Sequence, residues 1–506
     1  MHSETFYYFF HAIQAKIIQM QEKRALAKNS YHFLSGTLIS RLSGLLRDIS
    51  MAYAFGVTKE LAAFMVAFRF ANVARRLFGE SALSSSFIPH FEKVRVSGNQ
   101  QALFFRDFFF SLLFVLLLFV AAAEALTYFF FDSEITLYMR LMLPGLIFIS
   151  LYGLTSSLMN CEKRFFLPAL APIGFNCVWI ISALLLKGKD QAFTWLSYSV
   201  TLAFFAQLLM TLPFAWRWLK KELPKAHLFR FQLFSKEVKK AVKPFFLGFL
   251  GLGAMQLNMF FDALFARVSD PMGPAYLWYA IRLQQVPLAL FGVALSTALL
   301  PSLSRAYKEG DEAKGERLLT YALSRAFAFL FPATIGLSLV GEKAIDLLFG
   351  HGHFGGESVA LTSQCLVGYA LALVPAGWAL LIGPLFYAKG DYKTPLVGVL
   401  ISVSVNVAFN SFFIFYLGWG AESIAYATSF SALIQFFFLH YCWGGEIKLK
   451  ALFRIAACAA LALGTAFRGN IFWQTSIFCG TYLISAWTMK AEEILDLVPF
   501  KWPRRR

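Results

Sequence analysis

Two stretches of the chain, SALSSSFIPHFEKV at residues 81–94 and VALSTALLPSLSRA at residues 293–306, align without a gap. They share an Ala-Leu-Ser triplet and a proline at the same distance after it. A second pair, LMNCEKRFFLP at 158–168 and LFYAKGDYKTP at 385–395, repeats in the same register. Chance similarity between apolar helices is the alternative, but two matched pairs favour an internal repeat.

The repeat lies in a chain made largely of apolar segments. Hydrophobic residues make up 58% of the 506 residues and charged residues only 15%, which is typical of a polytopic membrane protein. A membrane-spanning helix needs about 20 mostly apolar residues. Fourteen stretches meet this requirement: 32–56, 61–92, 104–131, 135–160, 165–187, 191–218, 242–268, 274–305, 317–340, 358–388, 394–417, 421–443, 450–467 and 470–489.

The basic residues indicate the orientation of these spans. The net charge is +17, and Lys and Arg concentrate near both termini and in the loops after even-numbered spans. Cytoplasmic loops of membrane proteins carry this excess, so both termini are predicted to be cytoplasmic. No nucleic-acid-binding motif accompanies the positive charge, which excludes nucleic acid as the expected partner. The six cysteines are scattered and are interpreted as packing residues.

An offset of six spans gives the two halves the same orientation in the membrane. The predicted fold is therefore all-α, with about 14 transmembrane helices in two parallel six-helix lobes followed by two C-terminal helices. Such parallel repeats are typical of transporters that bind substrate near the bilayer midplane. The predicted domains are a basic cytoplasmic or interfacial extension (1–31), an N-lobe (32–218), a basic cytoplasmic linker (219–241), a C-lobe (242–443), the last two spans (444–489) and a basic cytoplasmic tail (490–506).

Charged residues lie in the middle of the first span, in RLSGLLRDIS at residues 41–50. Helical spacing places Ser40, Arg41, Gly44, Arg47 and Asp48 in one broad stripe. Each charge at the bilayer centre costs about 2.5–3.5 kcal/mol on insertion scales, so the stripe is expected to face a wet cavity or other charges. An internal salt bridge from Asp48 to either arginine is the structural alternative, and it leaves an excess of positive charge.

Further arginines occur in the second and eighth spans. Asn72 and Arg75 lie in FRFANVARRLFGES, and Arg282 lies in YAIRLQQVP. In a two-lobed transporter these spans flank the central cleft, so the cleft is expected to be rich in arginine. Guanidinium groups bind phosphate and diphosphate oxygens bidentately, which favours an anionic substrate. A purely structural role for the arginines is the alternative.

A second polar set lies in the C-terminal half: Asp262, Asn406, Asn410 and Thr428. Oxygen atoms from three helices suit Na⁺ or a proton-linked site, and interhelical hydrogen bonds are the alternative. The chain has no GxSxG, P-loop or Asp-rich metal motif. We therefore expect a transporter without enzymatic activity, driven by the membrane potential or an ion gradient.

SRLSGLLRDISMAYAFG (40–56) and FANVARRLFGESALSSSFIP (70–89) together resemble the first two helices of the MurJ/MviN lipid II flippase family. YAIRLQQVPLALFGVALSTALLPSLS (279–304) and FYAKGDYKTP (386–395) resemble its eighth span and its tenth-to-eleventh junction. The resemblance covers essentially the whole chain. It implies the fold of the multidrug/oligosaccharidyl-lipid/polysaccharide exporter superfamily, with a groove for the lipid tail at the last two helices.

The resemblance also implies a function in peptidoglycan biosynthesis and cell wall biogenesis. The substrate would be lipid II, the undecaprenyl-diphosphate-linked peptidoglycan precursor, moved from the inner to the outer leaflet of the bacterial cytoplasmic membrane by alternating access. Membrane lipids and cell-wall synthesis or division proteins would be further partners. A flippase for another polyprenyl-diphosphate-linked glycan is the alternative, followed by a drug or ion antiporter of the same superfamily.

Site residues carry over by position. The family's diphosphate-contacting arginines correspond to Arg47, Arg75 and Arg282, with Asp48 and Asn72 beside them and Arg41 and Ser40 as supporting cavity residues. The second polar set, Asp262, Asn406, Asn410 and Thr428, resembles the family's sodium site. The chain departs from the family at Ala62 and Gln285, where acidic residues are common, and at Asn410, where some members have Asp.

Overall fold

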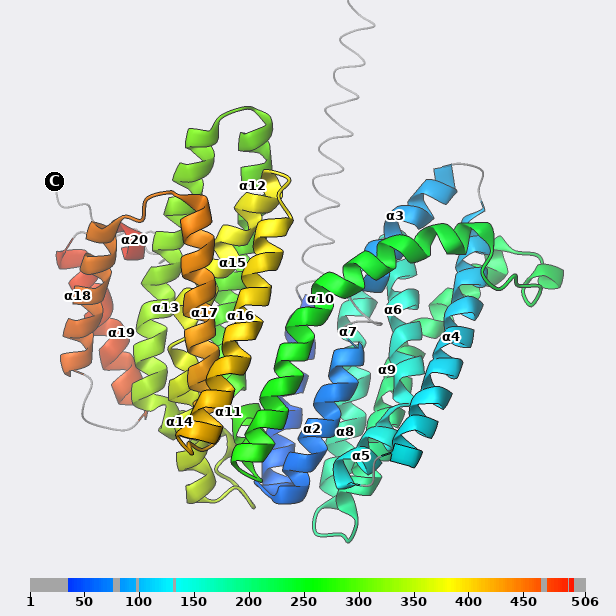
Figure 1. The fold of residues 1–506 in the computed structure, drawn as a ribbon, viewed down its shortest axis with the longest axis horizontal. Helices are drawn as coiled ribbons and strands as arrows, with labels where there is room; N and C mark the ends of the chain where they lie inside the picture. Colours follow the sequence, from blue (N-terminus) through cyan, green and yellow to red (C-terminus); the bar gives the residue numbers. More distant parts are fainter. Residues whose placement is uncertain are drawn as a thin grey trace, which may run out of the picture. The chain divides into compact units, whose positions relative to one another are not determined.

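All regular structure in the described part of the chain is helical, as the apolar runs predict (Figure 1). The computed structural model describes residues 35–75, 82–96, 100–130, 133–465, 471–489 and 491–495. The predicted extension 1–31 and most of the predicted tail 490–506 lie outside these residues. A helix over residues 35–55 comes first. The later elements are α2 (Lys59–Ala74), α3 (Ala82–Val96), α4 (Gln101–Phe130), α5 (Glu134–Met142), α6 (Gly145–Cys161), α7 (Phe166–Leu170), α8 (Pro172–Leu186), α9 (Ala192–Glu222), η2 (Lys225–His227), α10 (Lys236–Ser269), α11 (Gly273–Pro287), η3 (Leu288–Val293), α12 (Ala294–Lys308), α13 (Glu312–Phe349), α14 (Gly356–Ala370), α15 (Leu373–Ala388), α16 (Lys393–Ser411), η4 (Phe412–Tyr416), α17 (Glu422–Trp443), α18 (Leu449–Thr465), α19 (Ile471–Thr488) and α20 (Glu492–Leu495).

The described residues of each of the fourteen expected spans lie on one helix or on consecutive helical pieces. Proline accounts for two interruptions, because it lacks the N–H that an interior helical position donates. Pro144 separates α5 from α6, and Pro172 begins α8. Among the described residues, eight helical segments are long and apolar enough to cross a membrane, and the bent pair α14–α15 makes a ninth. The protein therefore crosses the membrane several times, while the count of fourteen stays a prediction.

The chain divides into two compact units whose limits differ from the predicted lobes. Unit 1 comprises the described residues up to Met51 together with Phe70–Leu252, and unit 2 comprises Ala52–Arg69 together with the described residues from Gly253 onward. Residues 52–69, predicted in the N-lobe, thus belong to unit 2, and the first part of α10 belongs to unit 1.

Polar contacts explain both reassignments. The Arg267 guanidinium in unit 2 donates to the carbonyl of Lys59 at 3.1 Å, which holds the start of α2 there. In unit 1, His90 on α3 contacts Glu237 at the start of α10 at 3.0 Å.

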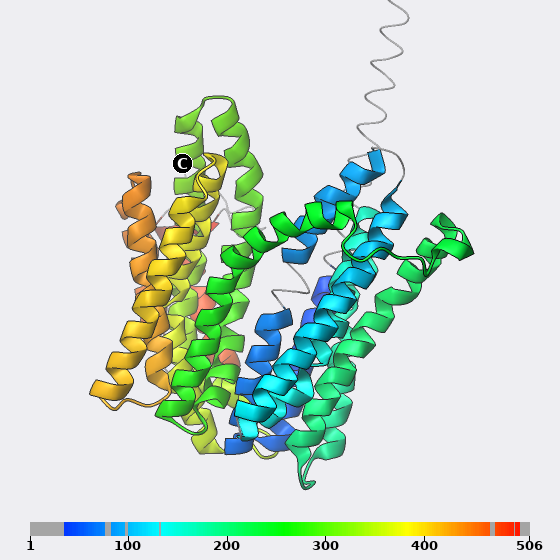
Figure 2. The same ribbon diagram turned by 45° about the vertical axis from the view of Figure 1, so that its right-hand side comes forward.

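Packing partners within the two units correspond, as the repeat predicts. In unit 1, α6 packs on α3, α4 and α9, and α8 packs on α9. In unit 2, α15 packs on α12, α13 and α17, and α16 packs on α17. The paired helices can be followed in both views (Figures 1 and 2). The repeated prolines, Pro89 and Pro301, lie inside the equivalent helices α3 and α12.

The last two long helices attach to unit 2 through α13. α18 packs against both α13 and α19. The Tyr482 hydroxyl on α19 donates to the Ala328 carbonyl on α13 at 2.7 Å. Small buried residues on α18, among them Ala459 and Ala462, allow the close approach that helix packing in membranes requires.

The predicted basic linker folds back onto α4. Arg106 on α4 is only 4% exposed and contacts Asp107 at 2.6 Å. The Arg106 guanidinium also donates to the carbonyl of His227 at 2.5 Å, and Asp107 accepts a hydrogen bond from the backbone N–H of Gln232 at 3.1 Å. A buried ion pair therefore links the linker to the helix.

Candidate functional site

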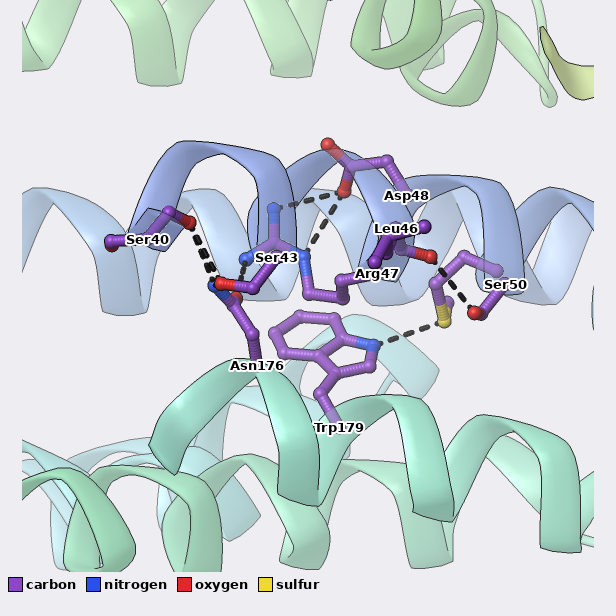
Figure 3. Close-up of polar contacts among 9 residues, drawn as sticks. Ser40, Ser43, Leu46, Arg47, Asp48, Ser50, Asn176 and Trp179 are labelled. Carbon is purple, nitrogen blue, oxygen red and sulfur yellow. Dashed lines mark hydrogen bonds and ion pairs between the residues drawn. The ribbon is translucent and has the colours of Figure 1, made fainter. Parts of the chain in front are cut away.

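Arg47 and Asp48 form a buried ion pair on the helix over residues 35–55 (Figure 3). Two nitrogens of the Arg47 guanidinium, Nε and Nη2, donate to Oδ1 of Asp48 at 3.1 and 2.9 Å. The third, Nη1, donates to Oδ1 of Asn176 on α8 at 3.2 Å. Arg47 is 9% exposed and Asp48 is 2% exposed. Of the two salt bridges open to Asp48, the structure contains the one with Arg47.

Aromatic rings on α8 complete the surroundings of Arg47. Its guanidinium carbon lies 5.0 Å from the centre of the Trp179 ring and 6.0 Å from that of Phe175. The Trp179 indole N–H in turn contacts the sulfur of Met51 at 3.0 Å. A cation held over an indole ring away from water gains stabilisation from the ring quadrupole. Figure 3 shows the indole ring beneath the Arg47 side chain.

Asn176 joins α8 to the upstream part of the motif. Its Nδ2 donates to Oγ of Ser43 at 2.8 Å and to the carbonyl of Ser40 at 3.4 Å. A Cβ on Gly44 would lie 3.8 Å from this nitrogen, an ordinary contact, so the packing of α8 does not require glycine there. The sequence interpretation missed Asn176, and an asparagine inside the apolar run PIGFNCVWI was the available signal.

The structure divides the predicted stripe of the first helix into two parts. Arg47 and Asp48 are buried inside unit 1, whereas Arg41 is exposed, as are Leu42 and Leu46. The seven-residue spacing places Arg41 and Asp48 on similar faces, but only Asp48 is buried. Burial therefore distinguishes Arg41 from the Arg47–Asp48 pair.

The other two predicted arginines each have a neighbour on their own helix. Nε of Arg75 donates to Oδ1 of Asn72 at 2.8 Å in unit 1. Arg282, in unit 2, lies with its guanidinium carbon 4.2 Å from the centre of the Trp278 ring. Both arginine residues are half-buried, and each guanidinium lies against a neighbour on its own helix.

The second predicted polar set meets within unit 2. Nδ2 of Asn410 donates to Oδ1 of Asp262 at 3.0 Å and to Oδ1 of Asn406 at 2.9 Å. Nδ2 of Asn406 donates to Oγ1 of Thr428 at 3.4 Å, and that hydroxyl donates to the Ile424 carbonyl at 2.9 Å. Side chains from α10, α16 and α17 are thus joined by a continuous chain of hydrogen bonds.

Hydrogen bonds within this set occupy oxygen atoms that a sodium ion would need as ligands. Na⁺ takes oxygen ligands, yet the two oxygens of Asp262 and Asn406 are bridged by an N–H₂ group of Asn410. The set contains one carboxylate, and no group of three or more His, Cys, Asp or Glu side chains suited to a metal occurs in the part of the chain that the structure describes. The sodium assignment at Asp262, Asn406, Asn410 and Thr428 stays a prediction from the resemblance.

Comparisons with known proteins extend over both units. A family model described as lipid II flippase MurJ matches residues 51–489. A probable lipid II flippase MurJ from Chlamydia pneumoniae is 32% identical, over 95% of this chain and 87% of that protein. Another from Thermotoga maritima is 30% identical, over 93% of this chain and 98% of that protein.

Solved structures match as well. A lipid II flippase MurJ in an inward closed conformation matches with a TM-score of 0.78 at 26% identity, over 91% of this chain and 99% of that one. An inward-facing multidrug resistance MATE family transporter of the MOP superfamily matches with a TM-score of 0.65 at 16% identity, over 84% of this chain and 98% of that one. The second likeness shows a shared fold.

Proposed function

Because the chain belongs to the lipid II flippase MurJ family, we propose that it moves lipid II from the inner to the outer leaflet of the bacterial cytoplasmic membrane. The observation that carries this function is the family match across residues 51–489, which includes both units and the helices that contain Arg75 and Arg282. Transport of this precursor supplies peptidoglycan biosynthesis outside the cytoplasm.

The site residues suit the diphosphate of such a cargo. We propose that Arg75 and Arg282 bind its oxygens, since the family resemblance places them at the diphosphate and Asn72 and the Trp278 ring orient their guanidinium groups. Bidentate guanidinium contacts with a diphosphate are strong where water is scarce. Arg41, exposed on the first helix, offers a further cationic contact near Ser40 and Gly44.

Arg47 differs from Arg75 and Arg282 in the contacts that orient its guanidinium. Asp48 and Asn176 already accept hydrogen bonds from three of its nitrogens, so the side chain is held rigidly against α8. We propose that Arg47 presents its remaining N–H groups to the diphosphate while Asp48 fixes the orientation of the guanidinium. A rigid, already oriented donor loses little entropy on binding.

The proposed activity moves the cargo without converting it chemically, so binding must differ between two conformations. We propose alternating access driven by the membrane potential or an ion gradient, with both termini in the cytoplasm. The charge distribution of the loops supports this orientation. Cell-wall synthesis or division proteins are proposed as further partners, because they use the exported precursor.

A leaflet-accessibility assay for lipid II in cells depleted of the protein tests the function. Depletion is expected to remove lipid II from the outer leaflet, and expression of Arg75→Ala or Arg282→Ala variants is expected not to restore it. Lysine at either position is expected to restore it partly, because the charge remains and the fork geometry is lost. Arg317→Ala, at an exposed position on α13, is the control and should restore it fully.

Three results would contradict parts of the proposal. Unchanged outer-leaflet lipid II after depletion would overturn the function, and loss of a different polyprenyl-diphosphate-linked glycan would identify the alternative cargo. Full restoration by both alanine variants would overturn the assignment of Arg75 and Arg282 as diphosphate ligands. Membrane levels of each variant, measured in parallel, separate lost binding from failed insertion.

A further inference from the structure

A buried arginine that the proposed transport function does not use lies in unit 2 beside Asp262. Arg69, on α2, is 5% exposed. Its Nη1 donates to the backbone carbonyl of Met259 at 3.1 Å, and Met259 lies one helical turn before Asp262 on α10. Asp262 is equally buried, at 5% exposure. The hydrogen bond to Met259 holds the guanidinium at the turn of α10 that precedes Asp262.

The charges of this cluster balance without an added ion. Asp262 supplies one negative charge and Arg69 one positive charge, while Asn406, Asn410 and Thr428 are neutral. A sodium ion would leave the cluster with a net positive charge in a region shielded from water. Uncompensated charge in such a region is costly, so a second cation is disfavoured while Arg69 stays in place.

Hydrogen bonding agrees with the charge argument. The Asn410 amide nitrogen bridges the carboxylate of Asp262 and the amide oxygen of Asn406, at 3.0 and 2.9 Å. Rotating this amide to offer its oxygen to a cation would remove both hydrogen bonds. The Asn410 Oδ1 atom is buried and accepts no hydrogen bond from the described residues. An experiment must therefore distinguish the observed orientation of the Asn410 amide from the rotated one.

We propose that Arg69 is the resident counter-cation of Asp262, so that this cluster is complete without bound sodium. The same contacts anchor α2 within unit 2, because Arg69 is the last residue of the segment Ala52–Arg69 that belongs to that unit. Arg69 is thus a positioning residue for α2, which also carries Asn72. The inference rests on unit 2 alone and is independent of the cargo.

Thermal unfolding of the purified full-length protein in NaCl and in KCl of equal ionic strength tests the inference. The wild-type protein is expected to have the same Tm in both salts. Arg69→Gln leaves the Asp262 carboxylate without its counter-cation, so this variant is expected to gain a Na⁺-selective rise in Tm of a few degrees. Arg69→Lys keeps the charge and should remain indifferent to the choice of salt.

A second variant keeps the test decisive if Arg69→Gln does not fold. Asn410→Asp adds a carboxylate of nearly the same shape while Arg69 is intact, so it is expected to gain the same Na⁺-selective rise. Asp107→Asn, a change at a buried ion pair in unit 1, is the control and should create no Na⁺ response.

Three outcomes would overturn the inference. A Na⁺-selective rise in the wild-type protein that Asp262→Asn abolishes would establish a sodium site instead. A folded Arg69→Gln variant that is indifferent to Na⁺ would show that Arg69 is not the counter-cation, and an indifferent Asn410→Asp variant would count against the charge argument. Transport is not the readout, so these outcomes leave the proposed function to its own assay.

Discussion

At the scale of single residues, the sequence identifies which charges need partners, and the packing of α8 decides which ones receive them. The spacing in RLSGLLRDIS places Arg41, Arg47 and Asp48 on neighbouring faces without distinguishing their roles. The structure buries Arg47 and Asp48 against Asn176 and leaves Arg41 exposed. The sequence therefore identified the residues of the polar stripe. Packing against α8 decided which of them form a buried pair and which arginine is exposed.

We predict that Arg47→Ala strongly destabilises the protein. Asp48 accepts two hydrogen bonds from Arg47 and is almost fully buried, so removing the guanidinium takes both hydrogen bonds from a buried carboxylate. Breaking a buried pair on one side typically costs about 3–5 kcal/mol. Thermal unfolding of the purified variant measures the loss.

The double variant Arg47→Met/Asp48→Asn separates stability from transport. It removes both charges, so it is expected to recover most of the lost stability. Outer-leaflet delivery of lipid II should nevertheless stay absent if Arg47 contacts the diphosphate. Recovery of transport together with stability would show that the pair is purely structural.

Two glycines join the end of the first helix to the loop before α14. Gly56 has a φ of +59° and Gly352 a φ of +66°, values that side-chain-bearing residues rarely adopt. A Cβ on Gly56 would overlap the His353 carbonyl oxygen, and one on Gly352 would overlap that of Tyr53. His353 also donates its backbone N–H to the Tyr53 carbonyl at 3.4 Å. Both positions require glycine for conformation and for space.

We predict that Gly56→Ala lowers the Tm clearly more than Gly310→Ala. Gly310 has a φ of +76° but has no atom within 4 Å of an added Cβ, so its substitution carries only the left-handed cost of roughly 1–2 kcal/mol. Gly56→Ala carries that cost and also displaces the loop at His353. Equal losses of Tm in the two variants would contradict the close contact.

At the scale of elements, the linker between α9 and α10 is held against α4, which its sequence does not predict. Its basic composition predicts a cytoplasmic connection, and nothing in the sequence of the linker itself shows that it is held in place. The Arg106–Asp107 pair on α4 holds it through His227 and Gln232. Aromatic stacking adds to this, with the rings of Phe110 and Phe231 4.2 Å apart.

We predict that Asp107→Ala destabilises the protein and exposes the linker to protease. The change leaves the buried Arg106 without its carboxylate and removes the acceptor for the Gln232 N–H, so a loss of about 3–5 kcal/mol is expected. Limited trypsin digestion at Lys225 and Arg230, followed by mass analysis, measures the release.

The control for this prediction is Lys240→Ala, which removes an exposed ion pair with Glu237 and should change neither Tm nor cleavage rate appreciably. An Asp107→Ala variant that is cleaved no faster than the control would show that the linker is held by its aromatic contacts instead.

At the scale of the whole molecule, the repeat and the charges of the loops predict the orientation of the chain in the membrane. Both halves carry the same packing order, and the Lys- and Arg-rich loops fall on one side when the spans are counted as fourteen. One additional or missing span would place half of the basic loops on the wrong side. Measuring the side of the membrane on which each loop lies therefore tests the count of fourteen spans directly.

We predict that cysteines introduced at Gly188 and Gly418 react with a membrane-impermeant maleimide in intact cells. Cysteines at Gly310 and Gly390 should react only after the membrane is permeabilised. All four glycines have a positive φ and open space around an added Cβ, so the variants share the same structural cost. The background removes the exposed cysteines Cys177, Cys442 and Cys479. Labelling of all four from one side would contradict the orientation.

The sequence by itself determined the helical membrane class, the repeat, the family and the residues with unusual charge. These properties depend on hydropathy, period and local motif, which are read along one chain segment at a time. Only the tertiary structure decided that Arg47 pairs with Asp48, that Asn176 bridges to Ser43, and that Asn410 bridges Asp262 to Asn406. Pairing of buried charges depends on which helices pack together, and residues as distant as Arg69 and Met259 meet only when the chain has folded.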